Sequence, residues 1–153
     1  MKQLVEKCLL GLAIALATLC GSAQAAPVIS WTTAQSARVY FIETHALPIV
    51  DVQVLFLAGT AFDAPDKPGV ASLTASLMDQ GAGARNEQQV AETLADIGAT
   101  LSVGAGLDSA TVSLRTLSDP ERRSVAFGVM ADVMARPAFE RAIFKRDQAR
   151  ALA

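Results

Sequence analysis

The stretch that decides the fold is DKPGVASLTASLMDQG, residues 66–81. The Pro68–Gly69 pair interrupts the chain near its start, and Gly81 is suited to end a helix in the left-handed conformation. Leu73 and Leu77 are four residues apart, and residues at this spacing share one face of a helix. The stretch therefore predicts a single helix, stopped at both ends, that packs one apolar face on the rest of the protein.

Two strand-like segments precede this helix. Residues 38–42 form a short apolar run, and residues 50–57 alternate apolar side chains before ending in Leu-Phe-Leu. This pattern predicts a second strand that is half-exposed at its start and buried at its end. A polar turn containing His45 separates the two segments, so we expect them to form a hairpin.

A second helix and two further strands follow the deciding stretch. Asn86 and Gln89, three residues apart, resemble a capping box and predict a helix that ends at Gly98. Residues 100–103 and 110–117 then read as strands, because apolar and polar side chains alternate along them.

The last part of the chain predicts two more helices. Ser118 with Glu121, and Pro120 between them, mark the start of a third helix, and Arg136–Pro137 marks its end. Its apolar stripe consists of Ala126, Val129, Met130 and Val133. A charged helix follows from residue 139. Strands grouped in pairs with helices between them predict an α+β fold, an antiparallel-rich sheet with helices packed on one face.

The first 25 residues have the pattern of a signal peptide. Two lysines precede an apolar run at residues 9–19, and residues 23–25 form an A-x-A cleavage signal. The apolar run is shorter than the ~20 residues that span a membrane. We therefore expect cleavage after Ala25, export to the periplasm and no membrane attachment afterwards.

Charge and cysteine content exclude several classes of function. Cleavage would remove both cysteines, Cys8 and Cys20, and with them disulfide and thiol chemistry, although a lipid anchor on Cys20 stays open. The chain has 13 basic and 15 acidic residues, and no run of basic ones. It therefore lacks the positive surface that nucleic-acid binding requires.

Several short motifs occur in a characteristic order, and each is weak alone. They are Leu47–Pro48, the strand at 50–57, Ala58-Gly59-Thr60, Asp63, Gly69-Val70-Ala71, AETLADIGA at 91–99 and RPAF at 136–139. Together they resemble the N-terminal part of the insulinase/pitrilysin family of zinc peptidases, which includes the mitochondrial processing peptidases. Members of that family are longer, and this chain stops within a helical pattern. We therefore expect residues 26–153 to be a truncated, incomplete part of an insulinase-family peptidase-like domain.

The resemblance implies where a zinc site would lie. The family's H-x-x-E-H helix would place His, Glu and His at Ser72, Ala75 and Ser76, and none of these three can bind zinc or activate water. By family spacing the distal Glu ligand would fall at residues 151–153, where there is no carboxylate, and Asp147 is the nearest acid. The whole chain has one histidine, His45. We therefore expect no catalytic residue, no metal ligand and no cofactor in this chain.

Other polar residues favour ordinary roles. Ser72 and Ser76 lack an oriented base and are interpreted as small packing residues. Asp63 and Asp66 are interpreted as solvated loop residues. Residues 140–147 are interpreted as an exposed helix face with ion pairs four residues apart.

The leading hypothesis is a catalytically silent subunit, a pseudoenzyme of proteolysis. It would form a heterodimer with a zinc-bearing homologue, and the pair would handle peptide substrates. An alternative is a stand-alone periplasmic peptide-binding or scaffold protein that kept the fold and lost the enzyme. A third hypothesis, an active zinc metalloendopeptidase, rests on family membership alone.

Overall fold

The computed structural model describes residues 26–151, so the signal-peptide prediction for residues 1–25 lies outside the described residues. The chain divides into two units at Ala46–Leu47. In the first unit, β1 (Val28–Thr32) and β2 (Arg38–Ile42) form an antiparallel hairpin with Val28 opposite Ile42. No helix within residues 26–151 has the length and apolar character needed to cross a membrane.

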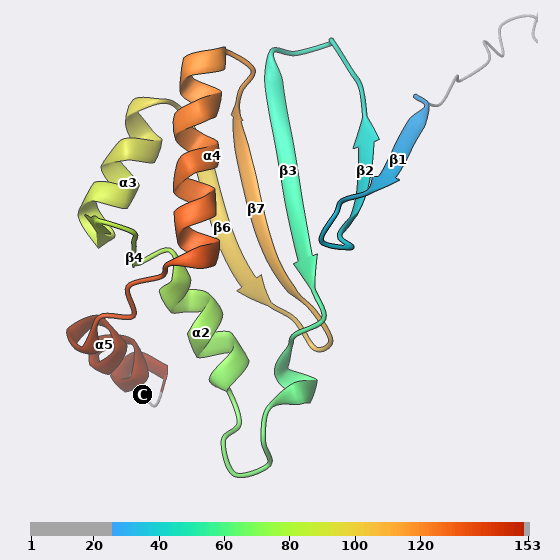
Figure 1. The fold of residues 1–153 in the computed structure, drawn as a ribbon. Coiled ribbons are helices and arrows are strands. Elements are labelled where there is room, and N and C mark those ends of the chain that lie inside the picture. Colours follow the sequence, from blue (N-terminus) through green and yellow to red (C-terminus); the bar gives the residue numbers. More distant parts are fainter. Residues whose placement is uncertain (1–25, 152–153) are drawn as a thin grey trace, which may run out of the picture. The chain divides into compact units, whose positions relative to one another are not determined.

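The second unit is an α+β layer, as the sequence predicts (Figure 1). Its sheet has the order β3-β7-β6 and is antiparallel throughout. The strands are β3 (Ile49–Phe56), β6 (Thr100–Ala105) and β7 (Ala110–Leu117). The other elements are η1 (Thr60–Phe62), α2 (Val70–Met78), β4 (Gly81–Ala82), β5 (Arg85–Asn86), α3 (Glu87–Asp96), α4 (Pro120–Ala135) and α5 (Arg141–Ala151).

The predicted hairpin between residues 38–42 and 50–57 is wrong. The partner of β2 is β1, a strand that the sequence pattern did not reveal, and β3 pairs with β7 along its full length. Proximity in sequence favoured the hairpin, whereas the long-range partner β7 offers β3 eight matched residues.

The core lies between the sheet and the helices that cover it. Helix α4 runs along β7 (Figure 1), and its four apolar stripe residues are all buried, as predicted. Val112 and Leu114 of β7 pack against Ala126 and Met130 of α4. A second cluster joins α3 and β4 to the same helix, through Val90, Leu94, Ala82, Val129 and Val133.

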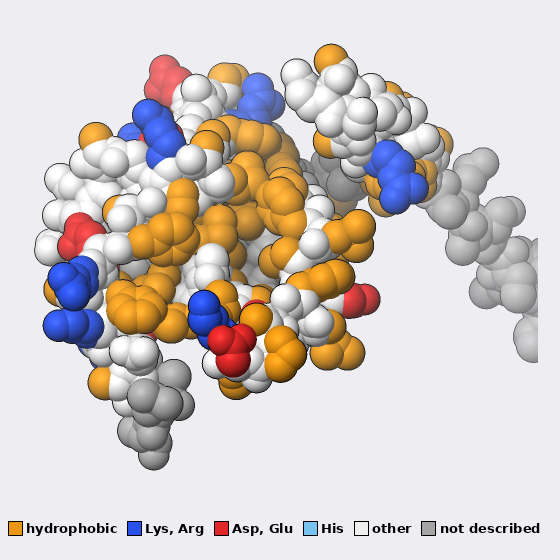
Figure 2. Space-filling view, turned by 60° about the horizontal axis from the view of Figure 1, so that its bottom comes forward, with side chains coloured by type: hydrophobic (Ala, Val, Ile, Leu, Met, Phe, Trp, Pro, Cys, Tyr) orange, Lys and Arg blue, Asp and Glu red, His pale blue; other side chains and the backbone are white. Residues whose placement is uncertain are grey.

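The end of β3 is exposed, in contrast to the prediction. Val52 and Val54 are half-buried against the core, but Leu55 is 64% exposed and Leu57, just beyond the strand, is 93% exposed. Periodicity alone could not show this, because it does not reveal how far along the strand the helices reach. Figure 2 shows hydrophobic side chains gathered over this end of the second unit.

The loop from β3 to α2 is tied to the turn between β6 and β7. The backbone N–H of Thr60 donates to Gly106 O at 3.0 Å, and that of Ala61 donates to Leu107 O at 2.8 Å. Gly59 makes this approach possible, because a Cβ there would lie 2.6 Å from Leu107 O. The start of the loop that leads to α2 is therefore held in place by the turn between β6 and β7.

Helix starts agree with the sequence in one case and shift by one residue in another. Asn86 and Gln89 form the predicted capping box of α3, with reciprocal bonds of 2.9 and 3.0 Å. Asp119, rather than the predicted Ser118, caps α4 by accepting a bond from Arg122 N at 3.0 Å. Pro120 is the first residue of α4, as expected.

Candidate functional site on helix α2

Helix α2 is positioned by a carboxylate outside it. Gly69 stands before the first turn with φ +89° and has no side chain with which to cap the helix. Asp63 supplies the cap instead, because its carboxylate accepts bonds from Gly69 N at 2.8 Å and Ala71 N at 2.9 Å. The interpretation of Asp63 as merely solvated is therefore wrong, whereas Asp66 is exposed as expected.

The three positions that the resemblance assigned to a zinc site lie on α2. Ser72 and Ser76 are exposed, and Ala75 is buried, with 4% of its surface exposed. The Ser76 hydroxyl donates to Leu73 O, one turn back, at 2.9 Å. The interpretation of Ser72 and Ser76 as small packing residues is therefore wrong, because both are exposed and the Ser76 hydroxyl bonds within its own helix.

These residues do not fit a zinc ion. Catalytic zinc is held by three nitrogen, sulfur or carboxylate ligands, whereas this face offers two hydroxyls and a methyl group. His45 belongs to the first unit, is exposed and lies 3.2 Å from Glu43. Across residues 26–151, no three His, Cys, Asp or Glu side chains are grouped so that they could hold a metal ion.

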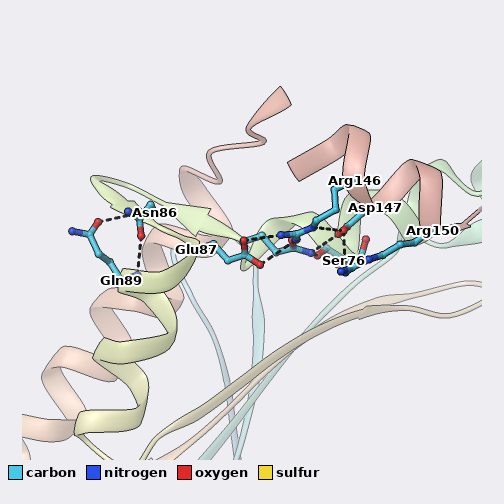
Figure 3. A network of polar contacts seen from close by, with 8 residues as sticks. Ser76, Asn86, Glu87, Gln89, Arg146, Asp147 and Arg150 are labelled. Atoms are coloured by element: carbon cyan, nitrogen blue, oxygen red, sulfur yellow. Dashed lines mark hydrogen bonds and ion pairs between the residues drawn. The ribbon is translucent and has the colours of Figure 1, made fainter. Parts of the chain in front are cut away.

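One turn beyond Ser76, a polar cluster joins α2 to α3 and α5 (Figure 3). We call it the Arg146 cluster; it consists of Gln80, Glu87, Arg146 and Asp147. The Arg146 guanidinium donates to both Glu87 oxygens at 3.0 and 3.1 Å, to Asp147 Oδ1 at 2.9 Å and to Gln80 Oε1. The Gln80 amide donates to Asp147 Oδ2 at 2.7 Å and to the Ser76 carbonyl.

The charged side chains of this cluster stabilise one another in their ionised forms. Hydrogen bonds from Arg146 first, and from Gln80 second, hold the pKa of Asp147 below its ordinary value. Bonds to Glu87 and Asp147 raise the pKa of Arg146, so it stays protonated. The prediction of an exposed α5 face is therefore wrong for Arg146 and Asp147, which are half-buried and reach other helices.

Asp79 lies at the C-terminal end of α2, beside this cluster. Its burial raises its pKa, and the nearby charge of Glu87 raises it further. It is the residue that ends α2, where the partial negative charge of the helix also disfavours a carboxylate.

The sequence contains one signal for the Arg146 cluster, the position of Gln80. Gln80 follows Ser72 and Ser76 at an interval of four, so it lies just beyond α2 on the side of those two residues. The participation of Glu87 and Arg146 could not be predicted, because they are 59 residues apart. The expected place of the distal ligand, residues 151–153, lies where no side chain is described, and Asp147 bonds to Arg146 and Gln80.

A second candidate surface lies on the face of the sheet opposite α4. A shallow hollow of about 530 Å³ is lined by side chains of all three strands, among them Gln53, Ser102 and Ser113. Arg115 and Asp51 also line it, and the Arg115 guanidinium donates two bonds to the Asp51 carboxylate, at 2.7 and 2.9 Å. Its small polar side chains have no strong acid–base or metal-binding character.

Comparison with known proteins decides the family. The family model described as "Insulinase (Peptidase family M16)" matches residues 38–153, which is well over half of the chain. The chain belongs to the insulinase family. No protein in a search of curated sequences matches this insulinase-family chain.

Two solved structures similar to this insulinase-family chain extend the comparison. One is a peptidase M16 inactive domain from Pseudomonas fluorescens, with 33% identity and a TM-score of 0.78 over 81% of this chain. The other is a protease from Helicobacter pylori, with 14% identity and a TM-score of 0.70 over 82% of this chain, and it supports the fold alone. The chain spans 30% of the length of each of these proteins.

Proposed function

We propose that this chain is a catalytically silent insulinase-family subunit that acts beside a zinc-bearing homologue in peptide degradation or processing. The observation that carries the proposal is the contrast on α2. The helix keeps its Asp63 cap and its anchored loop, but its site positions hold Ser72, Ala75 and Ser76. Zinc would be held by the homologue, and this chain would contribute shape and binding surface.

The similarity to an inactive domain supports the same proposal. The Pseudomonas fluorescens protein carries that description and is 33% identical to this chain. A protein that retains a peptidase fold without its ligands has a use if a partner supplies the chemistry, because the fold still forms one wall of a substrate site.

Reconstitution tests the proposal. The purified chain, a zinc-bearing homologue from the same genome and their mixture are assayed with a fluorogenic unstructured peptide, and zinc is measured in each. We expect no zinc and no hydrolysis with the chain alone, and faster hydrolysis with the mixture than with the homologue alone. The homologue with its motif Glu changed to Gln is the control. Zinc-dependent hydrolysis by the chain alone would overturn the proposal.

Rebuilding the motif tests the silent site directly. In the triple variant Ser72→His, Ala75→Glu and Ser76→His, two imidazoles four residues apart could share zinc, but a third ligand would still be absent. Ala75 is buried, so a glutamate there overpacks the site at a cost of about 1–3 kcal/mol. We expect weak zinc binding by calorimetry and no peptide cleavage. Robust cleavage would mean that a ligand comes from elsewhere in the protein.

The hollow on the open sheet face favours a second candidate function, a stand-alone peptide-binding or scaffold protein. Its polar lining and its Asp51–Arg115 pair could bind the polar groups of an extended peptide. A chain that stays monomeric beside its homologue and binds peptides, with Gln53→Leu weakening that binding, would favour this function over the first.

We propose export to the periplasm for either function. The A-x-A signal before Ala26 supports it, and mass spectrometry of the protein from its native host tests it. An N-terminus at Ala26 is expected, and a soluble form that retains Met1 would contradict it.

A further inference from the structure

Helix α5 is attached to the protein in an unusual way. None of the side chains from Arg141 to Arg150 is fully buried. Its main apolar contribution comes from Ile143, which is half-buried, since Phe144 is 37% exposed. Apolar burial therefore supplies little of the attachment.

The Arg146 cluster supplies the rest. The Arg146 guanidinium crosses to Glu87 at the start of α3 and to Gln80 just after α2, and Asp147 accepts a bond from Gln80. Hydrogen bonds between charged groups are stronger than neutral ones. The side chains of Arg146 and Glu87 are 37% and 44% exposed, so dissolved ions can reach and screen them.

The segment before α5 joins a fixed part of the backbone to a strained residue. The segment before it is fixed to β4 by backbone bonds, with Gly83 N donating to Arg136 O and Ala138 N donating to Gly81 O, both at 2.9 Å. The next residue, Phe139, has φ +46°. This left-handed conformation is unfavourable for a bulky residue and persists only where the surrounding contacts enforce it. Turning at Phe139 would relieve the strain and move α5 as a unit.

We propose that α5 is a strap, fastened across the end of α2 by the Arg146 cluster and hinged at Phe139, that opens when salt screens the cluster. Opening frees Gln80 and Glu87 and uncovers the end of α2 that follows Ser76. The strap thus places access to this surface under ionic control. The inference does not depend on the chain being a silent subunit, since it rests on contacts within this chain.

Hydrogen exchange of the full chain, read by mass spectrometry, tests the strap. Between about 0.01 M and about 1 M NaCl the Debye length falls from ~30 Å to ~3 Å. We expect amides in α5 to exchange about tenfold faster or more at high salt, as a group. Amides in α4 and the backbone N–H groups of Arg136 and Ala138 should keep their rates. Exchange in α5 that matches α4 and ignores salt would overturn the proposal.

Variants distinguish the loss of the Arg146 cluster's bonds from a general effect of salt on the protein. In Arg146→Met, α5 should exchange rapidly already at low salt and lose its salt dependence, while α4 stays protected. Arg146→Lys should lie between, because an ammonium cannot make the same forked bonds. The matched control is Arg141→Met, on the same helix but exposed, which should behave as the unchanged protein. Protection of α5 in Arg146→Met equal to that of the control would also overturn the proposal, and the α4 amides show whether each variant is folded.

Discussion

Helices α4 and α5 follow one another in the chain and are held in opposite ways. Helix α4 buries Ala126, Val129, Met130 and Val133 completely against β7, α3 and β4. Helix α5 buries no side chain completely between Arg141 and Arg150, and is held by one guanidinium and its partners.

The salt concentration should therefore act on α5 without acting on α4. Apolar burial is insensitive to modest salt, whereas partly exposed charges are screened by it. We therefore expect the sheet and α4 to unfold only with the whole unit, and α5 to open at a lower free energy.

The largest effect should come from removing a buried apolar side chain of α4. Met130 is 2% exposed and packs between α4 and the sheet, so Met130→Ala removes buried methylene groups and leaves a cavity. We expect a loss of about 2–5 kcal/mol in the free energy of unfolding, measured by urea denaturation. Val125→Ala, at an exposed position of the same helix, is the control and should change it by less than about 0.5 kcal/mol. Equal effects would contradict the assignment of the core.

A smaller effect should arise at the junction between the two helices. Gly83 has φ +62°, and a Cβ there would lie 2.6 Å from an oxygen of Asp132, the carboxylate that pairs with Arg85 and Arg136. Gly83→Ala should therefore destabilise the protein by about 1–3 kcal/mol, through backbone strain and displacement of that carboxylate.

Gly128 provides the opposite case for the same substitution. It lies within α4, and a Cβ there would meet nothing within 4 Å. Gly128→Ala should stabilise the protein by about 0.5–1 kcal/mol in the same denaturation experiment, because alanine favours the helix. Destabilisation by both variants would mean that α4 is packed on that side as well.

The smallest effect should appear at Asp79, beside the Arg146 cluster. Its raised pKa means that the folded protein holds this proton more tightly than the unfolded chain does, so the carboxylate opposes folding once it is ionised. Asp79→Asn should stabilise the protein by about 0.3–1 kcal/mol at pH 7. The gain should vanish as the pH falls through the raised pKa toward the ordinary value of 3.8. Asp66→Asn, in an exposed loop, is the control, and a gain independent of pH would contradict the explanation.

Local signals predicted much of the fold. The Pro-Gly pair placed the start of α2, and Asn86 with Gln89 placed the start of α3. The end of α2 was predicted less well, because the helix ends at Met78 and Gly81 lies in β4. The apolar stripe of α4 is buried residue for residue. These signals succeed because caps, breakers and helical periodicity act between residues a few positions apart.

The errors in strand pairing and in the α5 contacts share one physical cause, which is distance along the chain. The partner of β3 is β7, and the partners of Arg146 lie 59 and 66 residues away. A sequence pattern shows that a strand needs a neighbouring strand, or that an arginine needs an acceptor. It does not show which strand or which acceptor is the partner. At the candidate site, by contrast, the chemistry could be judged from residue identity alone, because the side chains of Ser72, Ala75 and Ser76 contain none of the usual zinc ligands.

The close approach at Gly59 has a consequence for variation of this protein. Any side chain at this position would meet the carbonyl groups of Gly106 and Leu107, which are backbone and cannot turn aside. At Gly104 an added Cβ would meet nothing within 4 Å. A library of random substitutions selected for folding should therefore retain only glycine at position 59, while position 104 becomes diverse. The substitutions found in such a library would identify the close contact at the start of the α2 loop without any structure.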